Sequence, residues 1–219
     1  MLLFYTVATA MVKTLLRSLT RWEVKGKENV PRNGPLIVVA NHLNLADPPL
    51  LSASIPRRIV FMAKEELFSS RGRAFVRAFG AFPVRRGRLD REALRQAMRV
   101  LESGRALGMF PEGKRSLNHQ MSEAELGVAL IALRSGAPIL PIGISGSENI
   151  RGFSFIFRRP KVTVTIGHLF SLPKREGRLT KDQLVQATGL IMGHIAEVLP
   201  QSYRGIYGDQ RSGGQENGN

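Results

Sequence analysis

The chain of 219 residues contains no cysteine, which excludes disulfide bonds, a thiolate nucleophile and cysteine-ligated metal sites. It also lacks the motif G-x-S-x-G, which places the nucleophilic serine of many hydrolases on a strand-to-helix turn. A group-transfer reaction on this chain would therefore use the substrate's own hydroxyl as the nucleophile. The absence of cysteine fits a cytoplasmic protein.

Acidic residues are scarce relative to basic ones. The chain has 17 Asp and Glu against 32 Lys and Arg, for a net charge of +15. The excess of basic residues is concentrated in residues 57–105 and 151–178. Such a charge favours an anionic partner, which leaves nucleic acid, a phospholipid surface and a phosphorylated or acidic substrate open. A solvated basic face is the simpler alternative.

No apolar run is long enough to cross a bilayer. The first 12 residues, MLLFYTVATAMV, are uncharged, and Lys13, Arg17 and Arg21 then follow at intervals of four. Twelve helical residues cover about 18 Å, against a hydrocarbon core of roughly 30 Å. A signal peptide is disfavoured because Lys13 interrupts the apolar region and no basic segment precedes it. We expect residues 1–22 to form an amphipathic helix that enters one leaflet, with Trp22 near the interface; an ordinary core helix is the alternative.

The rest of the chain alternates between strand and helix patterns. Apolar runs predict strands at 36–40, 59–63, 106–110, 138–144 and 161–167. Capping residues predict four helix starts: Asp47 before two prolines, Asp90, Ser122 with Glu125, and Thr180 with Gln183. This alternation predicts one α/β domain over residues 23–207, with a mixed, mostly parallel sheet flanked by helices. We expect residues 208–219 to form a disordered tail.

The stretch GMFPEGKRS, residues 108–116, nearly spells the phosphate-binding loop of nucleotide hydrolases. That loop needs serine or threonine directly after its lysine to hold magnesium, and Arg115 occupies this position. Pro111 removes one backbone amide, and Glu112 would add a negative charge beside the anion. The sequence therefore disfavours nucleotide hydrolysis.

A histidine and an aspartate follow the first buried strand, in NHLNLADPP at residues 41–49. His42 lies at the carboxyl end of that strand, where α/β sheets usually bind ligands. A turn between His42 and Asp47 would let the carboxylate accept a hydrogen bond from one imidazole nitrogen. The other nitrogen would then be free to take a proton from an alcohol. A loop histidine beside a helix-capping aspartate is the structural alternative.

Four segments occur in a fixed order: NHLNLAD at 41–47, GAFPVRRG at 80–87, FPEGKRS at 110–116 and ILPIGI at 139–144. Together they resemble the four motif blocks of the glycerolipid acyltransferase family, especially the bacterial lysophosphatidate acyltransferases of the PlsC type. FMAKEELF, residues 61–68, is similar to the family's segment between the first two blocks. The resemblance covers residues 36–144.

The resemblance implies a role for each matching residue. It makes His42 the general base and Asp47 the carboxylate that orients it. It also implies a set of substrate-binding residues: Lys64, Arg85, Arg86, Glu112, Gly113, Arg115 and Ser116. Among these, two adjacent arginines suit a phosphate because each guanidinium can bond it bidentately. Lys114 departs from the family pattern, which usually has threonine there.

The function implied by the resemblance is transfer of a fatty acyl group from acyl-CoA or acyl carrier protein to the sn-2 hydroxyl of 1-acyl-sn-glycerol 3-phosphate, giving phosphatidic acid. It implies no metal and no cofactor, with the thioester as co-substrate. We expect a peripheral or monotopic enzyme on the cytoplasmic face of the cell membrane. The same chemistry on glycerol 3-phosphate, another lysophospholipid or an aminolipid is the alternative. We expect no nucleic-acid partner, since the sequence has no recognised nucleic-acid-binding motif.

Overall fold

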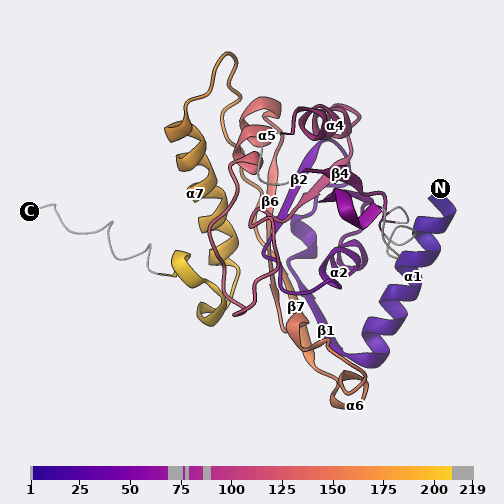
Figure 1. Cartoon of the computed structure of the whole chain (residues 1–219). Helices are drawn as coiled ribbons and strands as arrows, with labels where there is room; N and C mark the ends of the chain where they lie inside the picture. Colours follow the sequence, from indigo (N-terminus) through magenta and orange to yellow (C-terminus); the bar gives the residue numbers. More distant parts are fainter. Residues whose placement is uncertain (1, 69–75, 77–78, 86–89, 209–219) are drawn as a thin grey trace, which may run out of the picture.

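A computed structural model describes residues 2–68, 76, 79–85 and 90–208 as one α/β domain built on a seven-stranded sheet (Figure 1). The strands are β1 (Arg21–Lys25), β2 (Leu36–Ala40), β3 (Ile59–Lys64), β4 (Phe82–Val84), β5 (Ala106–Met109), β6 (Ile139–Ser145) and β7 (Lys161–Ile166). The helices are α1 (Leu2–Leu19), α2 (Asp47–Ser54), α4 (Arg91–Glu102), α5 (Gly127–Ser135), α6 (Phe155–Arg158) and α7 (Lys181–Glu197). The expected tail, from residue 209 onward, lies outside the described residues.

The strand order is β1-β7-β6-β2-β5-β3-β4. Only β6 and β7 pair in antiparallel fashion among these strands, and the other neighbours are parallel. The predicted mixed, mostly parallel sheet is therefore confirmed. Helices cover both faces, with α7 on one side of the sheet and α1 and α2 on the other (Figure 1).

Strand β2 lies in the middle of the sheet and is buried along its whole length. Ile37 and Val39 pack in one core cluster with α4, α5 and α7. Leu36, Val38 and Ala40 pack in the second cluster, which includes residues of α1 and α2. Side chains alternate between the faces of a strand, so an unbroken apolar run is what a strand covered on both faces requires. The loop after Ala40 consequently starts at the carboxyl edge of the central strand.

Two of the four predicted helix starts are confirmed. The Asp90 carboxylate caps α4 by accepting hydrogen bonds from the N–H groups of Glu92 and Ala93. Thr180 and Gln183 form the predicted capping box of α7. Both caps satisfy backbone N–H groups that have no partner inside their helix.

The other two predicted caps are wrong. The N-cap of α2 is Ala46, and the Asp47 side chain turns back toward the preceding loop. Helix α5 begins at Gly127, and Ser122 bonds to Glu112 instead of capping a helix. The Asp47 side chain bonds to the loop before the helix and the Ser122 side chain bonds to Glu112, so neither is available for the cap that the local pattern assigned to it.

Helix α1 packs one face on the domain and leaves the other exposed. Tyr5 and Leu16 are buried, and the Tyr5 hydroxyl accepts a hydrogen bond from the N–H of Ile59 at 3.3 Å. The exposed face carries large apolar side chains: Phe4, Val7, Met11 and Leu15. The helix ends at Leu19, so Trp22 lies in β1 and packs partly buried against the core. Within the described ranges, no helix has both the length and the apolar character needed to cross a membrane.

Candidate active site

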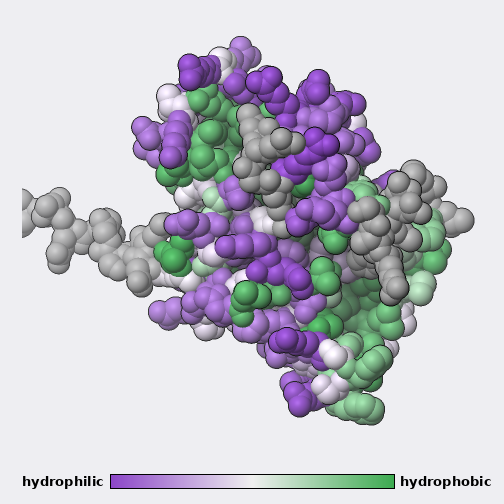
Figure 2. Space-filling view, viewed as in Figure 1, coloured by the Kyte–Doolittle hydropathy of each residue, from purple (hydrophilic) through white to green (hydrophobic). Residues whose placement is uncertain are grey.

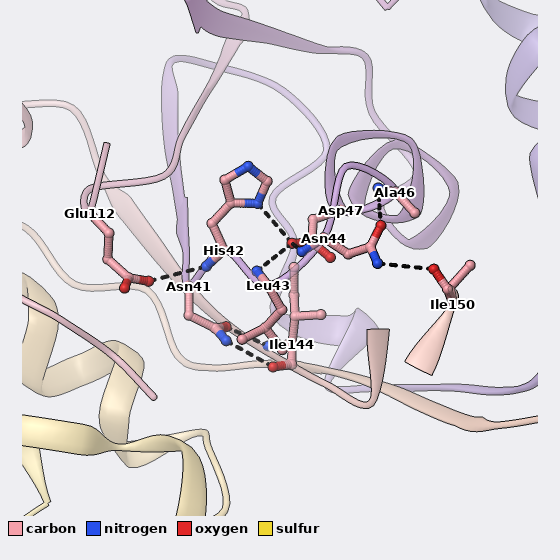
Figure 3. A network of polar contacts seen from close by, with 9 residues as sticks. All are labelled: Asn41, His42, Leu43, Asn44, Ala46, Asp47, Glu112, Ile144 and Ile150. Atoms are coloured by element: carbon pink, nitrogen blue, oxygen red, sulfur yellow. Dashed lines mark hydrogen bonds and ion pairs between the residues drawn. The ribbon is translucent and has the colours of Figure 1, made fainter. Parts of the chain in front are cut away.

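The predicted contact between His42 and Asp47 is present at the carboxyl edge of β2. His42 Nδ1 lies 2.8 Å from Asp47 Oδ2, and the carboxylate is completely buried. Figure 3 shows the second ring nitrogen pointing away from Asp47. A carboxylate can only accept, so the neutral ring carries its proton on Nδ1 and a free lone pair on Nε2. The pair thus presents a base suited to an incoming hydroxyl.

Asp47 is held in place by its own loop. Its Oδ2 also accepts hydrogen bonds from the N–H groups of Leu43 and Asn44, each at 2.7 Å (Figure 3). The turn that sequence spacing suggested therefore closes on the carboxylate itself. Its other oxygen, Oδ1, is buried and has no hydrogen-bond partner within the described part of the chain. With three donors on one oxygen, Asp47 fixes both the loop and the imidazole orientation.

Phe110 is a site residue that the sequence did not single out. Its ring stacks on the His42 imidazole with centroids 4.2 Å apart and planes 23° apart. Phe61 of β3 in turn stacks on Phe110, at 6.1 Å. The Phe110 ring therefore limits rotation of the imidazole and covers one of its faces, and Phe61 supports Phe110 from behind. The sequence offered one signal for Phe110, its position directly after the strand β5. His42 lies in the corresponding place, two residues after the end of β2.

Two asparagines of the same loop were also not among the predicted site residues. Asn41 is buried and pairs with the backbone of Ile144 in β6, donating to its carbonyl at 2.9 Å and accepting from its N–H at 2.7 Å. Asn44 donates to the Ile150 carbonyl and accepts from the Ala46 N–H (Figure 3). Asn41 thus ties the start of the His42 loop to β6, and Asn44 ties its later part to the segment that follows β6.

Glu112 and Ser116 lie against the backbone of His42. Glu112 Oε1 accepts from the His42 N–H at 3.2 Å, while Oε2 accepts from the N–H and the hydroxyl of Ser122 at 3.0 Å each. The Ser116 N–H donates to the His42 carbonyl at 2.8 Å, and its hydroxyl bonds Asn118. Both side chains are buried. Glu112 and Ser116 thus hold the histidine loop through its backbone. The resemblance predicts that these two residues contact the acceptor.

Burial raises the pKa of the Glu112 carboxyl above its ordinary value, although the Ser122 and His42 donors oppose this effect. A carboxyl with a raised pKa binds its proton more tightly in the folded than in the unfolded chain. Its stabilising contribution is therefore complete below the unfolded pKa and is lost as pH rises through the folded pKa.

We expect the Glu112→Gln variant to be less stable than the wild type by about 1–3 kcal/mol, because the amide cannot accept on both sides. The difference should be larger at pH 4 than at pH 8. The raised pKa of Glu112 adds stability to the wild type only where its carboxyl is protonated, and the glutamine does not titrate. Urea unfolding of both proteins at the two pH values measures it. A difference that grows with pH would contradict the assignment.

The predicted basic residues lie at the ends of neighbouring strands. Lys64 ends β3 and stands in register with Val84 of β4, which Arg85 follows. Lys64 pairs with Glu66 at 2.9 Å, and Arg85 pairs with Glu65 at 2.8 Å. Arg86 lies outside the described residues. Glu65 holds the pKa of the Arg85 guanidinium above its usual value, so this cation already has a carboxylate partner.

The remaining predicted substrate contacts are on the loop after Phe110. Gly113 has a positive φ of 66°, and its N–H donates to the Phe110 carbonyl, which makes the tight turn there. Arg115 is exposed and directly precedes Ser116. The guanidinium of Arg115 takes part in no ion pair among the described residues.

A cavity of about 680 Å³ reaches His42. Its walls are mostly apolar and come from α1, α2, β3 and the segment after β6, with Lys64 and Asn44 among the few polar members. This volume lies within the roughly 300–1,000 Å³ of ligand sites, which combine apolar walls with a few polar groups. A large apolar ligand can therefore reach the imidazole from one side. The described residues contain no cluster of His, Cys, Asp and Glu that would hold a metal ion.

Comparison with known proteins finds a matching family and similar sequences. The sequence model of the family described as Acyltransferase matches residues 21–145. The 1-acyl-sn-glycerol-3-phosphate acyltransferase of Streptococcus pneumoniae is 31% identical over 176 residues, which cover 76% of this chain and 62% of the relative. The Bacillus subtilis protein of the same name is 25% identical over 196 residues, 89% of this chain and 96% of the relative. The chain thus spans less than two thirds of the pneumococcal protein.

A solved structure has the same fold. The crystal structure of the 1-acyl-sn-glycerophosphate acyltransferase PlsC from Thermotoga maritima superposes with a TM-score of 0.66, over 89% of this chain and 79% of that one. The two sequences are 24% identical, so this likeness concerns the fold. The family match runs from β1 to the end of β6 and includes the His42 loop, Glu112 and Lys64. Since it covers more than half of the chain, this protein belongs to the acyltransferase family.

Proposed function

We propose that the chain transfers a fatty acyl group from a thioester to the sn-2 hydroxyl of 1-acyl-sn-glycerol 3-phosphate, giving phosphatidic acid. The observation that carries the proposal is the imidazole of His42, bonded to Asp47 and open to a large apolar cavity. The names of the pneumococcal and Bacillus relatives support this acceptor. The donor is acyl-CoA or acyl carrier protein, and no metal or cofactor takes part.

In the proposed mechanism His42 Nε2 removes the proton of the sn-2 hydroxyl as its oxygen attacks the thioester carbonyl carbon. Asp47 stabilises the imidazolium that forms. When the tetrahedral intermediate collapses, the carbon–sulfur bond breaks and the imidazolium returns its proton to the thiolate. General base assistance of this kind contributes roughly 10²–10⁴-fold, and holding both substrates together supplies much of the remainder.

The apolar cavity suits an acyl chain, and the basic residues suit the phosphate. Lys64 lines the same cavity as His42, and in the proposal it exchanges its ion pair with Glu66 for the acceptor's phosphate. Arg85 lies on the neighbouring strand end and Arg86 follows it. Arg115, without an ion-pair partner within the described ranges, adds a further cation beside the histidine loop.

We expect Arg86→Ala to raise KM for lysophosphatidate about tenfold or more, with a much smaller change in KM for the acyl thioester, because a guanidinium–phosphate contact acts on the acceptor alone. Arg85→Ala is the matched control, and its effect should be smaller because Glu65 already neutralises that cation. Steady-state kinetics with each substrate varied in turn measures both. Equal losses for donor and acceptor in Arg86→Ala would contradict this assignment.

The test of the function itself is an acceptor profile of the purified chain with one acyl thioester. Lysophosphatidate should be acylated faster than glycerol 3-phosphate, lysophosphatidylcholine or an aminolipid. Preference for one of these other acceptors would establish the alternative function, the same chemistry on a different acceptor.

The reaction is proposed to take place at the cytoplasmic face of the cell membrane, where α1 presents its exposed apolar face to the lipid.

A further inference from the structure

We propose that the segment from Arg151 to Arg159, which includes α6, is a second docking element for an anionic phospholipid surface. It would act beside α1 and set how the domain sits on the membrane. This inference rests on the membrane location proposed above and adds a defined contact surface to it.

The segment exposes aromatic side chains to an unusual degree. Phe153 is 87% and Phe157 is 88% exposed, and Ile156 between them is also exposed. Only Phe155 turns inward, where it lines the cavity that reaches His42. Isolated apolar residues are common on protein surfaces, but a cluster of large ones marks an interaction site. Phenylalanine is among the side chains that interfacial elements bury at the boundary between headgroups and acyl chains.

Cations surround these rings. Arg151, Arg158 and Arg159 belong to the segment, and residues 150–161 contain no Asp or Glu. None of the three arginines takes part in an ion pair among the residues that the structure describes. Arginines next to exposed apolar groups match a surface with negative headgroups above a hydrocarbon layer. This charge pattern favours an anionic bilayer as the partner.

The segment is joined to the end of α1. The Arg159 guanidinium donates to the Arg17 carbonyl at 3.2 Å, and the Arg21 guanidinium donates to the Arg159 carbonyl at the same distance. In Figure 2, hydrophobic residues extend over the part of the surface where Figure 1 draws α1 and α6. The apolar face of α1 and the aromatic segment therefore belong to neighbouring elements of the surface.

The cavity that reaches His42 is lined in part by α1 and by the start of this segment. Its walls include Leu15 and Leu19 of α1, Leu45 of the histidine loop, and Ile150 and Phe155 at the segment. If the bilayer covers both elements, an acyl chain passes from hydrocarbon into the cavity without crossing water. An acidic carrier protein would account for the arginines but not for the exposed rings of Phe153 and Phe157, so a lipid surface is the occupant that the geometry favours.

The test uses the full chain with Phe153→Ser and Phe157→Ser combined, in sedimentation with vesicles that contain phosphatidylglycerol. Removing both rings should weaken vesicle binding by roughly tenfold for each ring, on the order of a hundredfold together. Arg151→Gln with Arg158→Gln should weaken binding roughly fivefold per charge on anionic vesicles, with little change on neutral phosphatidylcholine vesicles. Leu190→Ser is the matched control, since Leu190 is an exposed apolar residue of α7 on the other side of the sheet.

Acyl transfer is measured on the same proteins with substrates dispersed in detergent. The Phe153→Ser/Phe157→Ser variant should keep wild-type turnover there, because neither ring lines the cavity. Unchanged vesicle binding in this variant, or an equal loss in Leu190→Ser, would overturn the proposal. Loss of binding to an acidic carrier protein, with vesicle binding intact, would instead assign the segment to a protein partner and also overturn it. Vesicle binding by a protein without acyltransferase activity would refute the proposed function alone.

Discussion

Replacing His42 by alanine is expected to leave a folded protein whose acyl transfer is slower by about 10²–10⁴-fold, the contribution of a positioned general base. Nε2 of this residue is the nitrogen left free by the bond to Asp47, and the ring stands at the wall of the apolar cavity. The Nδ1 bond is lost too, but Asp47 keeps its two backbone donors, so the loop should persist.

The measurement is phosphatidate formation by purified protein from lysophosphatidate and an acyl thioester, with far-ultraviolet circular dichroism as the check on folding. His194→Ala is a matched control. His194 also bonds a carboxylate, that of Glu197 at 3.2 Å, but the pair lies half exposed on α7. This control should retain near-normal turnover. Near-normal turnover in His42→Ala would reject the assignment of His42 as the base.

Asp47→Asn is expected to lower kcat by up to about 10⁴-fold, the loss that follows the same change of the orienting carboxylate in histidine-based triads. The asparagine carbonyl can take the place of Oδ2 and accept the same three hydrogen bonds, so the loop should fold. What disappears is the negative charge that stabilises the imidazolium in the transition state. The effect should therefore fall on kcat, with KM for both substrates little changed.

The same kinetic assay, together with the unfolding free energy of the variant, separates these effects. A large loss of stability would show that Asp47 acts mainly through the fold. Wild-type kcat in a folded Asp47→Asn protein would contradict the role of the carboxylate in proton transfer.

Much of the fold follows from local patterns. The apolar run of β2 predicted a buried strand, because only a strand covered on both faces needs five apolar residues in a row. Asp90 and Thr180 predicted helix starts because their caps use nearby backbone groups. The same reasoning failed at Asp47 and Ser122, whose side chains bond to His42 and Glu112. Contacts with the loops before these helices outweighed the capping preference there.

The contacts of the candidate site also divide into those between residues close in sequence, which could be predicted, and those between residues far apart, which could not. His42 and Asp47 are five residues apart, so sequence spacing was enough to predict their hydrogen bond. Glu112 lies 70 residues from His42, and its bond to the His42 N–H depends on β5 lying beside β2. The stacking of Phe110 on the imidazole has the same origin. The predicted roles of Lys64 and Arg86 came from family resemblance and stay predictions about substrate binding.

Rapid-quench measurement of the wild-type protein with an acyl thioester, with and without lysophosphatidate, tests the central claim most directly. With the acceptor present, we predict that free thiol and phosphatidate form together in equal amounts; without it, no thiol is released, because the base acts on the acceptor's hydroxyl. Release of one equivalent of thiol per enzyme in the absence of acceptor would mean that the chain itself carries the acyl group, and would contradict the account.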